Sequence, residues 1–319
     1  MRMATAHLLT TDEIVATRAV IDPVFLDSPL MRHPALDDAL GCAITLKVET
    51  LNPIRSFKGR GTEAVLAALA PRPPAVITAS TGNFGQGIAW AARRRGVAAT
   101  IYVPAGANPL KVDAMRRLGA VVHLAEPGAD ESDAAREAAD RIGAPFIEDG
   151  THREIAAGAG TIAQELTAAG LSPDVVLVQI GDGALVTGIG SWLRVTSPST
   201  RVVGLTARNA PAMADSLATG APVERPANTI ADGMSITKPV GGALEQVAAA
   251  VDEILPVTDE AMLAAMRLLL ERAGVLAEPA GAAGVAALLE HPSRFAGAAI
   301  VTVITGSNVD PTLLQRLTG

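Results

Sequence analysis

One lysine in the sequence lies where a polar loop enters a helical pattern. Lys58 follows the segment 52–57 and is flanked by Gly59 and Gly61, which lower helix propensity. A helix start favours anions over cations, so a partly buried amine placed there is shifted toward its neutral, nucleophilic form. Such an amine can form a Schiff base with a carbonyl compound. Because catalytic lysines are rare, a structural or surface role for Lys58 stays open when it is considered alone.

A second segment has the residue types of an anion site. Residues 80–87 follow an expected strand at 75–78 and open a helical pattern that we place at 86–95. Hydroxyls, glycines and backbone N–H groups at a helix start bind an anion such as a carboxylate, and here they belong to Ser80, Thr81, Gly82 and Asn83. Asn83 can also hydrogen-bond a ring hydroxyl. An ordinary capped helix start, with glycines for tight packing, explains the segment equally well.

A third segment again has the order strand, glycine-rich turn and helix. Such a turn lets the backbone wrap a phosphate, and the backbone concerned is that of Gly181, Asp182, Gly183, Ala184 and Leu185. A dinucleotide-binding G-x-G-x-x-G loop is the rival interpretation, but Val186 stands where the third glycine belongs. Because a carboxylate is out of place among anion ligands, we expect Asp182 to point outwards or to cap the helix.

A fourth segment, residues 305–308, ends an expected strand at 300–304. The neutral hydroxyl of Thr305 can hydrogen-bond a heteroaromatic nitrogen without protonating it. A turn with a capping threonine is the alternative interpretation.

The composition narrows the kind of partner. The formal charge is −7 without a dense Lys/Arg block, and aromatic residues make up only 3%, which argues against nucleic acid or an anionic membrane. The longest apolar region, 273–289, is interrupted by Glu278 and Pro279, which argues against a spanning helix. Cys42 alone allows no internal disulfide, and residues 1–10 show no secretory signal. We expect a cytoplasmic protein with a small-molecule partner.

The elements that must position these segments follow an α/β pattern. Thr10 and Glu13 form a capping box that opens a helix. Short β-type runs then alternate with helical stretches such as 86–95 and 130–141; the runs lie at 43–48, 75–78, 99–103, 121–124, 145–147, 175–180, 202–205 and 300–304. Such alternation predicts two α/β domains with parallel sheets and αβα layering, and a ligand cleft between them.

Together the four segments resemble the fold-type II pyridoxal phosphate enzymes of the tryptophan synthase beta superfamily, most closely the serine/threonine dehydratase branch. The resemblance spans residues 29–308, with the motifs in the family's order. Residues 231–233, Ala-Asp-Gly, and residues 278–281, Glu-Pro-Ala-Gly, also look like that branch. The resemblance implies pyridoxal 5′-phosphate as the cofactor, a small amino acid as the substrate, and a homodimer.

The resemblance also implies roles for single residues. Lys58, beside Phe57, would hold the cofactor as a Schiff base and act in catalysis. Asn83 would contact the 3-hydroxyl of the cofactor, Thr305 would face its pyridine nitrogen, and Glu278 would lie near. The phosphate would rest on the backbone of residues 181–185. The substrate carboxylate would be held by Ser80, Thr81, Gly82 and Asn83.

By the same resemblance, residues 1–60 and 151–319 form a large cofactor-binding domain, and residues 61–150 form a small, mobile substrate-binding domain. Departures from the dehydratase pattern concern the details of the site. Phe84 replaces a common His, and residues 181–185 are not an all-glycine run. Thr305, where Ser or Cys is usual, is also reminiscent of threonine synthase. Residues 206–209 lack the acidic side chain with which some relatives bind a divalent cation, so no metal site is expected.

The expected reaction is a β-elimination. Lys58 takes the Cα proton of a threonine- or serine-like substrate, water is lost, and the product hydrolyses to a 2-oxo acid and ammonia. A racemase would need a second acid, for which Thr81 is the candidate. Replacement at the β or γ carbon would need cations such as Arg55 or Arg60, although these are more simply solvated or ion-paired arginines. A non-catalytic homologue that binds a small anion is the alternative outside the enzymes.

Overall fold

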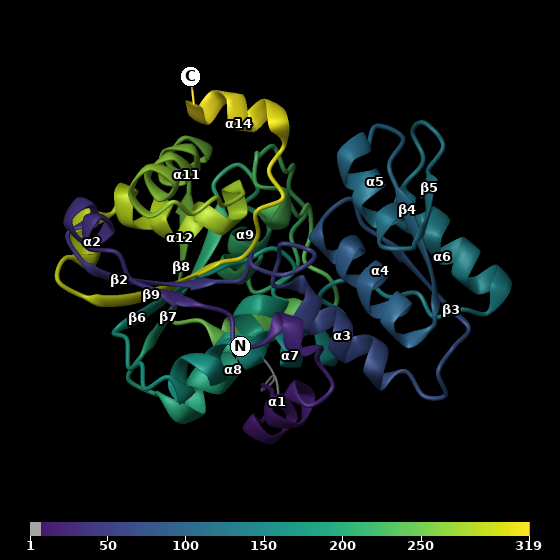
Figure 1. The fold of residues 1–319 in the computed structure, drawn as a ribbon, viewed down its shortest axis with the longest axis horizontal. Helices are drawn as coiled ribbons and strands as arrows, with labels where there is room; N and C mark the ends of the chain where they lie inside the picture. The colour runs from purple at the N-terminus through teal and green to yellow at the C-terminus, as the bar shows by residue number, and fades with distance from the viewer. Residues whose placement is uncertain (1–7, 319) are drawn as a thin grey trace.

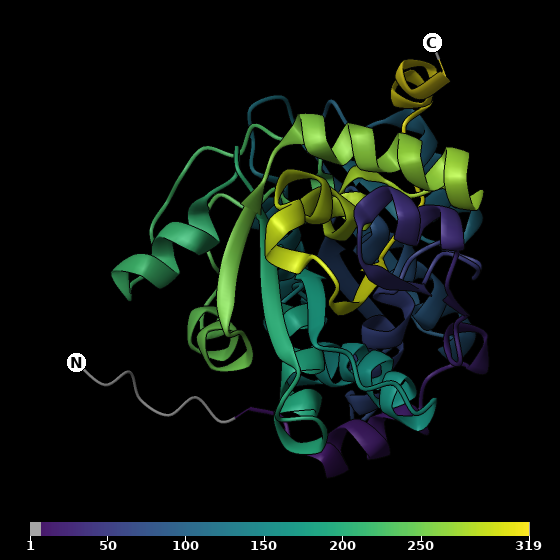
Figure 2. The same ribbon diagram turned by 90° about the vertical axis from the view of Figure 1, so that its left-hand side faces the viewer.

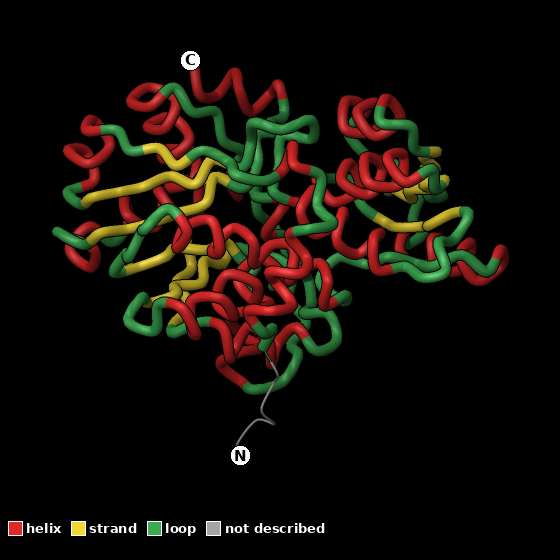
Figure 3. The backbone as a smooth tube through the Cα atoms, turned by 60° about the horizontal axis from the view of Figure 1, so that its bottom comes forward, coloured by secondary structure: helices red, strands yellow, loops and turns green. Residues whose placement is uncertain are grey.

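The structure is a computed structural model that describes residues 8–318, and it divides into a large and a small lobe, each with its own sheet (Figure 1). The strands of the two sheets form two separate groups in Figure 3. The expectation of no secretory signal falls largely on residues 1–7, which lie outside the described residues. Within residues 8–318, no helix combines the length and apolar character needed to cross a membrane.

The large lobe is built on a six-stranded sheet in the order β1-β2-β9-β6-β7-β8. The pairs β2–β9, β9–β6, β6–β7 and β7–β8 are parallel, and β1 runs antiparallel to β2. The strands are β1 (Leu30–Met31), β2 (Ala43–Val48), β6 (Val175–Gln179), β7 (Arg201–Ala207), β8 (Glu253–Val257) and β9 (Ala299–Ile304). Strand β6 is buried along its whole length, as expected for a parallel sheet covered on both faces.

Helices cover both faces of this sheet (Figures 1 and 2). Alternate residues of β6 enter different cores: Val176 and Val178 belong to one, and Val175 and Leu177 to the other. The first core extends into the small lobe, and among the large-lobe helices that contribute to it are α1 (Thr11–Arg18), α7 (Arg153–Ala168), α8 (Ala184–Thr196) and α10 (Ala243–Ala250). The helices of the second core are α2 (Pro34–Leu40), α11 (Asp259–Ala273), α12 (Pro279–Glu290), α13 (Pro292–Phe295) and α14 (Pro311–Thr318).

The loops of the large lobe carry the remaining short elements. These are the 3-10 turns η1 (Pro23–Phe25) and η2 (Asp232–Met234), and the helix α9 (Ala212–Thr219). The turn η2 contacts α12, which brings residues 232–234 close to the start of that helix.

The small lobe has a parallel three-stranded sheet in the order β3-β4-β5. Its elements are β3 (Ala75–Ala79), β4 (Ala98–Val103), β5 (Val121–Leu124), α4 (Asn83–Arg95), α5 (Pro109–Arg117) and α6 (Glu131–Ile142). Helix α6 packs on β3 and β4, and α4 packs on the same strands and on α5. The expected strand at 145–147 is reduced to a single bridge between Phe146 and Ile77.

Helix α3 (Lys58–Ala68) joins the lobes, because it packs on α7 of the large lobe and on α4 of the small lobe. A Cβ at Gly158 of α7 would lie 2.5 Å from the carbonyl oxygen of Arg60, so only glycine allows the two helices to pack this closely. Because Lys58 is the first residue of α3, its position depends on this packing.

Arg60, in the first turn of α3, is fully buried and ion-paired. Its guanidinium donates to both oxygens of Glu49 at 2.8 Å and to Oε1 of Glu165 at 2.6 Å. The amine of Lys47 donates to the other oxygen of Glu165 at 2.5 Å. Burial opposes ionisation of Glu165, but hydrogen bonds and charges from Arg60 and Lys47 hold its pKa at about 2. The ion-paired interpretation of Arg60 is thus confirmed.

The predicted fold class is confirmed, and most predicted elements lie within a few residues of their observed positions. The Thr10–Glu13 capping box opens α1 as predicted. Helix α4 begins at Asn83, three residues before the expected start at 86. Strands β1 and β8 were not predicted: β1 has two residues, and β8 contains Pro256, which is compatible with its place at the edge of the sheet.

Candidate active site

A pocket of about 830 Å³ lies between the lobes, a size typical of ligand-binding cavities. It opens where β6 and β9 of the large sheet and β3 and β4 of the small sheet end, the usual place for ligands in open α/β sheets. Seven carboxyl groups line it, those of Glu131, Glu148, Asp149, Asp182, Asp232, Glu278 and Asp310. Its basic side chains are those of Lys58, Lys111 and Arg316. The lining is therefore mainly anionic.

Lys58 is held at the wall of this pocket by the end of β9. The N–H of Phe57 donates to the carbonyl of Thr305 at 3.0 Å, and Ser56 pairs with Gly306 in an isolated bridge. Among the described residues no side chain caps the start of α3, although Ser56 Oγ accepts from the N–H of Lys58 at 3.3 Å. The backbone contacts thus place the start of α3, and Lys58 with it, next to the end of β9.

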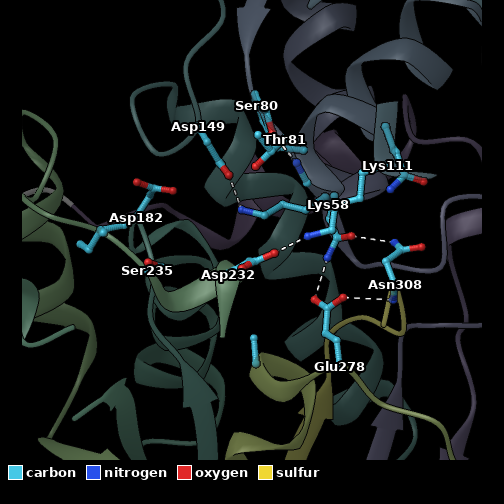
Figure 4. Close-up of a pocket in the computed structure, with 18 of the residues that line it drawn as sticks. Lys58, Ser80, Thr81, Lys111, Asp149, Asp182, Asp232, Ser235, Glu278 and Asn308 are labelled. Carbon is cyan, nitrogen blue, oxygen red and sulfur yellow. Dashed lines mark hydrogen bonds and ion pairs between the residues drawn. The ribbon is translucent and has the colours of Figure 1, made fainter. Parts of the chain in front are cut away.

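The amine of Lys58 forms an ion pair with Asp149, and both side chains are 17% exposed (Figure 4). It also lies over the ring of Phe57 at 5.0 Å and over that of Phe84 at 5.8 Å from the centroids, which stabilises an ammonium. The second oxygen of Asp149 is buried without a hydrogen-bond partner in the part of the chain that the structure describes. The sequence analysis did not identify Asp149, because its contact with Lys58 joins segments 91 residues apart.

The sequence predicts a phosphate site at the turn between β6 and α8, which we call the cup (residues 181–185). Its N-cap residue, Gly183, has φ +98° and offers no capping side chain, so the first N–H groups of α8 stay available to an anion. A Cβ at Gly181 would lie 2.3 Å from the carbonyl oxygen of Gly233. Ala184 and Leu185 contribute backbone and buried side chains to the first turn of the helix.

Asp182 does not behave as expected from the sequence. It lines the pocket instead of pointing outwards, and it makes no capping bond to α8. A Cβ added at Gly150 would lie only 2.6 Å from the Cβ of Asp182. The Asp182 side chain therefore lies against the backbone of Gly150, the residue that follows Asp149. Burial, and then the charge of Asp149, raise the pKa of Asp182 to about 7.

The segment 80–83 makes a turn from β3 into α4. Ser80 Oγ accepts from the N–H groups of Gly82 at 3.3 Å and Gly85 at 3.1 Å, so this hydroxyl stabilises the turn itself. The N-cap residue Gly82 provides no capping side chain, and Thr81 and Gly82 line the pocket. The start of α4 therefore presents backbone N–H groups to an anion.

Three polar side chains join the two lobes at the far side of Lys58. Asn83 Nδ2 donates to Glu278 Oε1 at 2.7 Å, and Asn308 Nδ2 donates to Asn83 Oδ1 at 2.7 Å. The N–H of Asn308 donates to Glu278 Oε2 at 3.1 Å (Figure 4). Burial raises the pKa of Glu278. Asn308 is part of the fourth segment, but nothing in the sequence indicated its contact with Asn83.

Comparisons with known proteins show the family of the chain. A family model described as "Pyridoxal-phosphate dependent enzyme" matches residues 21–306. The chain belongs to this family. The "L-threonine ammonia-lyase" of Thermotoga maritima is 35% identical to it, over 97% of this chain and 78% of that protein.

Two solved structures superpose on nearly the whole length of this chain. The threonine deaminase isoform 2 of Solanum lycopersicum superposes with a TM-score of 0.89 at 26% identity, covering 100% of this chain and 98% of that one. Maize serine racemase superposes with a TM-score of 0.90 at 28% identity, covering 98% and 97%. The family membership confirms the fold-type II resemblance and the predicted cofactor, pyridoxal 5′-phosphate.

The residues present fit this cofactor. Lys58 supplies an amine at the pocket wall, and the uncapped start of α8 supplies N–H groups for a phosphate. Thr305, 4% exposed, ends β9 inside the pocket with a neutral side chain. Gln179 was not identified from the sequence: it is 5% exposed, donates to the carbonyl of Val303 at 2.9 Å, and its Oε1 has no partner among the described residues.

Two further contacts cross the pocket mouth and were not predicted. Lys111 of α5 pairs with Asp232 of η2, and Asn108 at the start of α5 donates to Asp310. Asp232 is 67% exposed and Lys111 21% exposed at the side chain. Because each contact joins the small lobe to the large lobe, the two contacts link the start of α5 to the opposite rim of the pocket.

Proposed function

We propose that the chain is a pyridoxal-phosphate-dependent ammonia-lyase. It eliminates water from a small β-hydroxy amino acid of the threonine or serine type and releases a 2-oxo acid and ammonia. The main support for this proposal is that Lys58 lines the same pocket as the cup, the start of α4 and Thr305. The printed names of the relatives, L-threonine ammonia-lyase and threonine deaminase, support the same reaction.

Lys58, Asp149 and Thr305 have different roles in the proposed reaction. Lys58 would hold the cofactor in the resting protein and would become a free amine when the amine of the substrate takes its place. The cofactor would supply an electron sink for the negative charge that develops at Cα. Lys58 Nζ removes the Cα proton, and Asp149, in direct contact with Nζ, orients the amine. The neutral hydroxyl of Thr305 hydrogen-bonds the ring nitrogen without protonating it. A limited electron sink favours prompt loss of the β-hydroxyl over a long-lived carbanion.

The start of α4 holds the substrate carboxylate in this proposal. Ser80 Oγ accepts from the N–H groups of Gly82 and Gly85, so the N–H groups of Asn83 and Phe84 are the ones at this helix start that would hold the carboxylate, and Thr81 lines the pocket beside them. Asn83 is held by Glu278 and Asn308, and it would contact the 3-hydroxyl of the cofactor. Residues 61–150 then form the mobile substrate-binding domain, because they carry this carboxylate site.

Racemisation of the same substrates is the second candidate. The structural similarity to maize serine racemase favours it, and Thr81 is the hydroxyl on the pocket wall available as the second acid. A lone threonine hydroxyl is a weak acid, so elimination takes precedence in the proposal.

Product analysis tests both candidates. The cofactor-loaded protein is incubated with L-threonine and L-serine, and 2-oxo acid, ammonia and the D-amino acids are measured. Equal amounts of 2-oxo acid and ammonia are expected, whereas D-amino acid alone contradicts the lyase. Lys58→Ala is expected to abolish turnover and the absorbance band near the visible edge. The exposed Lys238→Ala is the matched control and should keep both.

We also infer a homodimer and a cytoplasmic location from the family resemblance and the composition. Light scattering coupled to size-exclusion chromatography measures the first, and a mass of one chain contradicts it. The charge of −7 also predicts no affinity for nucleic acid, which a gel-shift titration measures.

A further inference from the structure

The cup, in which we expect the phosphate to bind, contains one carboxyl group, that of Asp182. Asp182 is the second residue of the cup, between Gly181 and Gly183, and its side chain lines the pocket. Its side chain does not cap α8, so the first N–H groups of that helix stay available to an anion. Figure 4 shows Asp182 and Asp149 on the same side of Lys58.

The charges around Asp182 do not favour its ionised form. The charged groups that act on it are Asp149, Lys58 and Glu148, of which two are carboxylates. The cation among them, Lys58, is already paired with Asp149. Glu148 is paired with Arg136 at the outer side of the pocket. When Lys58 is bonded to the cofactor, its amine is committed to that bond and cannot serve as a free counter-ion for Asp182.

We propose that Asp182 binds the phosphate of the cofactor as a protonated carboxylic acid, so that cofactor binding takes up one proton. An ionised Asp182 would repel a phosphate dianion bound to the neighbouring N–H groups. The protonated acid instead offers an O–H that donates to a phosphate oxygen, a short and strong type of hydrogen bond. The proton comes from water and adds to one carboxylate oxygen of Asp182.

The proton balance sets the pH dependence. Burial and the charge of Asp149 raise the pKa of Asp182 to about 7 in the protein without cofactor, and a bound dianion raises it further. A group that must be protonated in the complex weakens binding by up to about tenfold for each pH unit above that pKa. The phosphate is already a dianion above pH 7, since its second pKa is about 6, so its own titration does not produce this slope.

Pyridoxine 5′-phosphate is a suitable probe, because it has the phosphate but an alcohol in place of the aldehyde and cannot bond to Lys58. Its dissociation constant is measured by calorimetry on the cofactor-free full-length chain between pH 6 and pH 9. Repeating the titration in buffers of different ionisation enthalpy gives the number of protons taken up. The variants are Asp182→Asn and Asp182→Gly, with Glu148→Gln as the control for a neighbouring carboxyl group.

For the unmodified chain we expect affinity to fall above pH 7 by up to about tenfold per pH unit, with uptake of close to one proton at pH 8. Asp182→Asn and Asp182→Gly should lose both effects and bind at least tenfold more tightly than the unmodified chain at pH 9. Glu148→Gln should keep the slope. Circular dichroism checks that each variant is folded.

Equal pH dependence in the unmodified chain and Asp182→Asn overturns the proposal, as does loss of binding at every pH in a folded Asp182→Asn. The inference rests on the cofactor site of the proposed function, but different experiments would contradict the inference and the proposed function. Failure of pyridoxal 5′-phosphate to give a Lys58-dependent absorbance band, or of the loaded protein to release ammonia, contradicts the proposed function. Neither result changes how pyridoxine 5′-phosphate responds to Asp182.

Discussion

Asn83, the first residue of α4, donates to the buried carboxyl group of Glu278, the N-cap residue of α12, at 2.7 Å. The bond joins the small lobe to the large lobe directly beside the pocket. A Cβ at Gly306 would lie 2.4 Å from Oε1 of Glu278, so the backbone of the fourth segment also packs against this carboxyl group. Glu278 is thus fixed from both lobes.

Replacing Asn83 by Ala should impair the enzyme without unfolding it. The change leaves the buried Glu278 oxygen without its donor, which costs about 1–3 kcal/mol. It also removes the group that we propose to contact the 3-hydroxyl of the cofactor. We expect kcat/KM for ammonia release to fall by roughly tenfold or more. Asn209→Ala, at an exposed position, is the control. Unchanged kcat/KM in Asn83→Ala contradicts the role.

Replacing Arg60 by Met should destabilise the whole protein. The guanidinium is fully buried between Glu49 and Glu165, and its loss leaves two buried carboxylates short of a counter-charge. Breaking a buried ion pair in this way costs about 3–5 kcal/mol. Urea unfolding measures the loss. Arg208→Gln, which removes a weak surface pair at 3.8 Å, should cost less than about 1 kcal/mol. Similar losses in both variants would contradict the prediction.

Glu165 should make stability fall in acid. Its pKa is about 2 in the folded chain, against 4.5 without the surroundings, because the hydrogen bonds and charges of Arg60 and Lys47 outweigh burial. The folded pKa is depressed, so the contribution is complete above about pH 5 and disappears as the pH falls toward 2. The shift corresponds to about 3 kcal/mol. As the pH falls from 5 to 2, the free energy of unfolding of the unmodified chain should therefore approach that of Glu165→Gln. If the difference between the two free energies stays constant over this pH range, the prediction is wrong.

The sequence predicted those parts of the site that are local in the chain. Each of these parts lies in a single continuous segment of the chain: the cup, the turn at 80–83, and Lys58 at the start of α3. Within such a segment, glycines and hydroxyls next to a helix start indicate an anion site directly. Helix α4 starts earlier than predicted because Gly85 and Gly87 lower helix propensity but are needed for packing: a Cβ at Gly87 would lie 2.7 Å from Thr62 Oγ1.

Contacts between distant segments could not be predicted from single residues. Asp149 reaches Lys58 across 91 residues, and Asn308 reaches Asn83 across 225. The orientation of Asp182 was wrongly predicted for the same reason. Gly150, next to which its side chain lies, and Asp149, whose charge raises its pKa, belong to another loop.

The pair Lys111–Asp232 should affect substrate binding more than catalysis. It joins α5 of the small lobe to η2 across the pocket mouth, together with the contact of Asn108 with Asp310. Because both partners keep exposed surface, the pair is worth at most about 1 kcal/mol, and Lys111→Ala should raise KM by roughly two- to fivefold with little change in kcat.

A double-mutant cycle separates this pairing from a direct contact of Lys111 with the substrate. If the pair acts by linking the start of α5 to the opposite rim, Asp232→Ala should raise KM as much as Lys111→Ala. The double variant should then be no worse than either single one. If Asp232→Ala instead lowers KM, Asp232 competes with the substrate for Lys111. In that case the lysine, rather than the inter-lobe pair, determines which substrates bind.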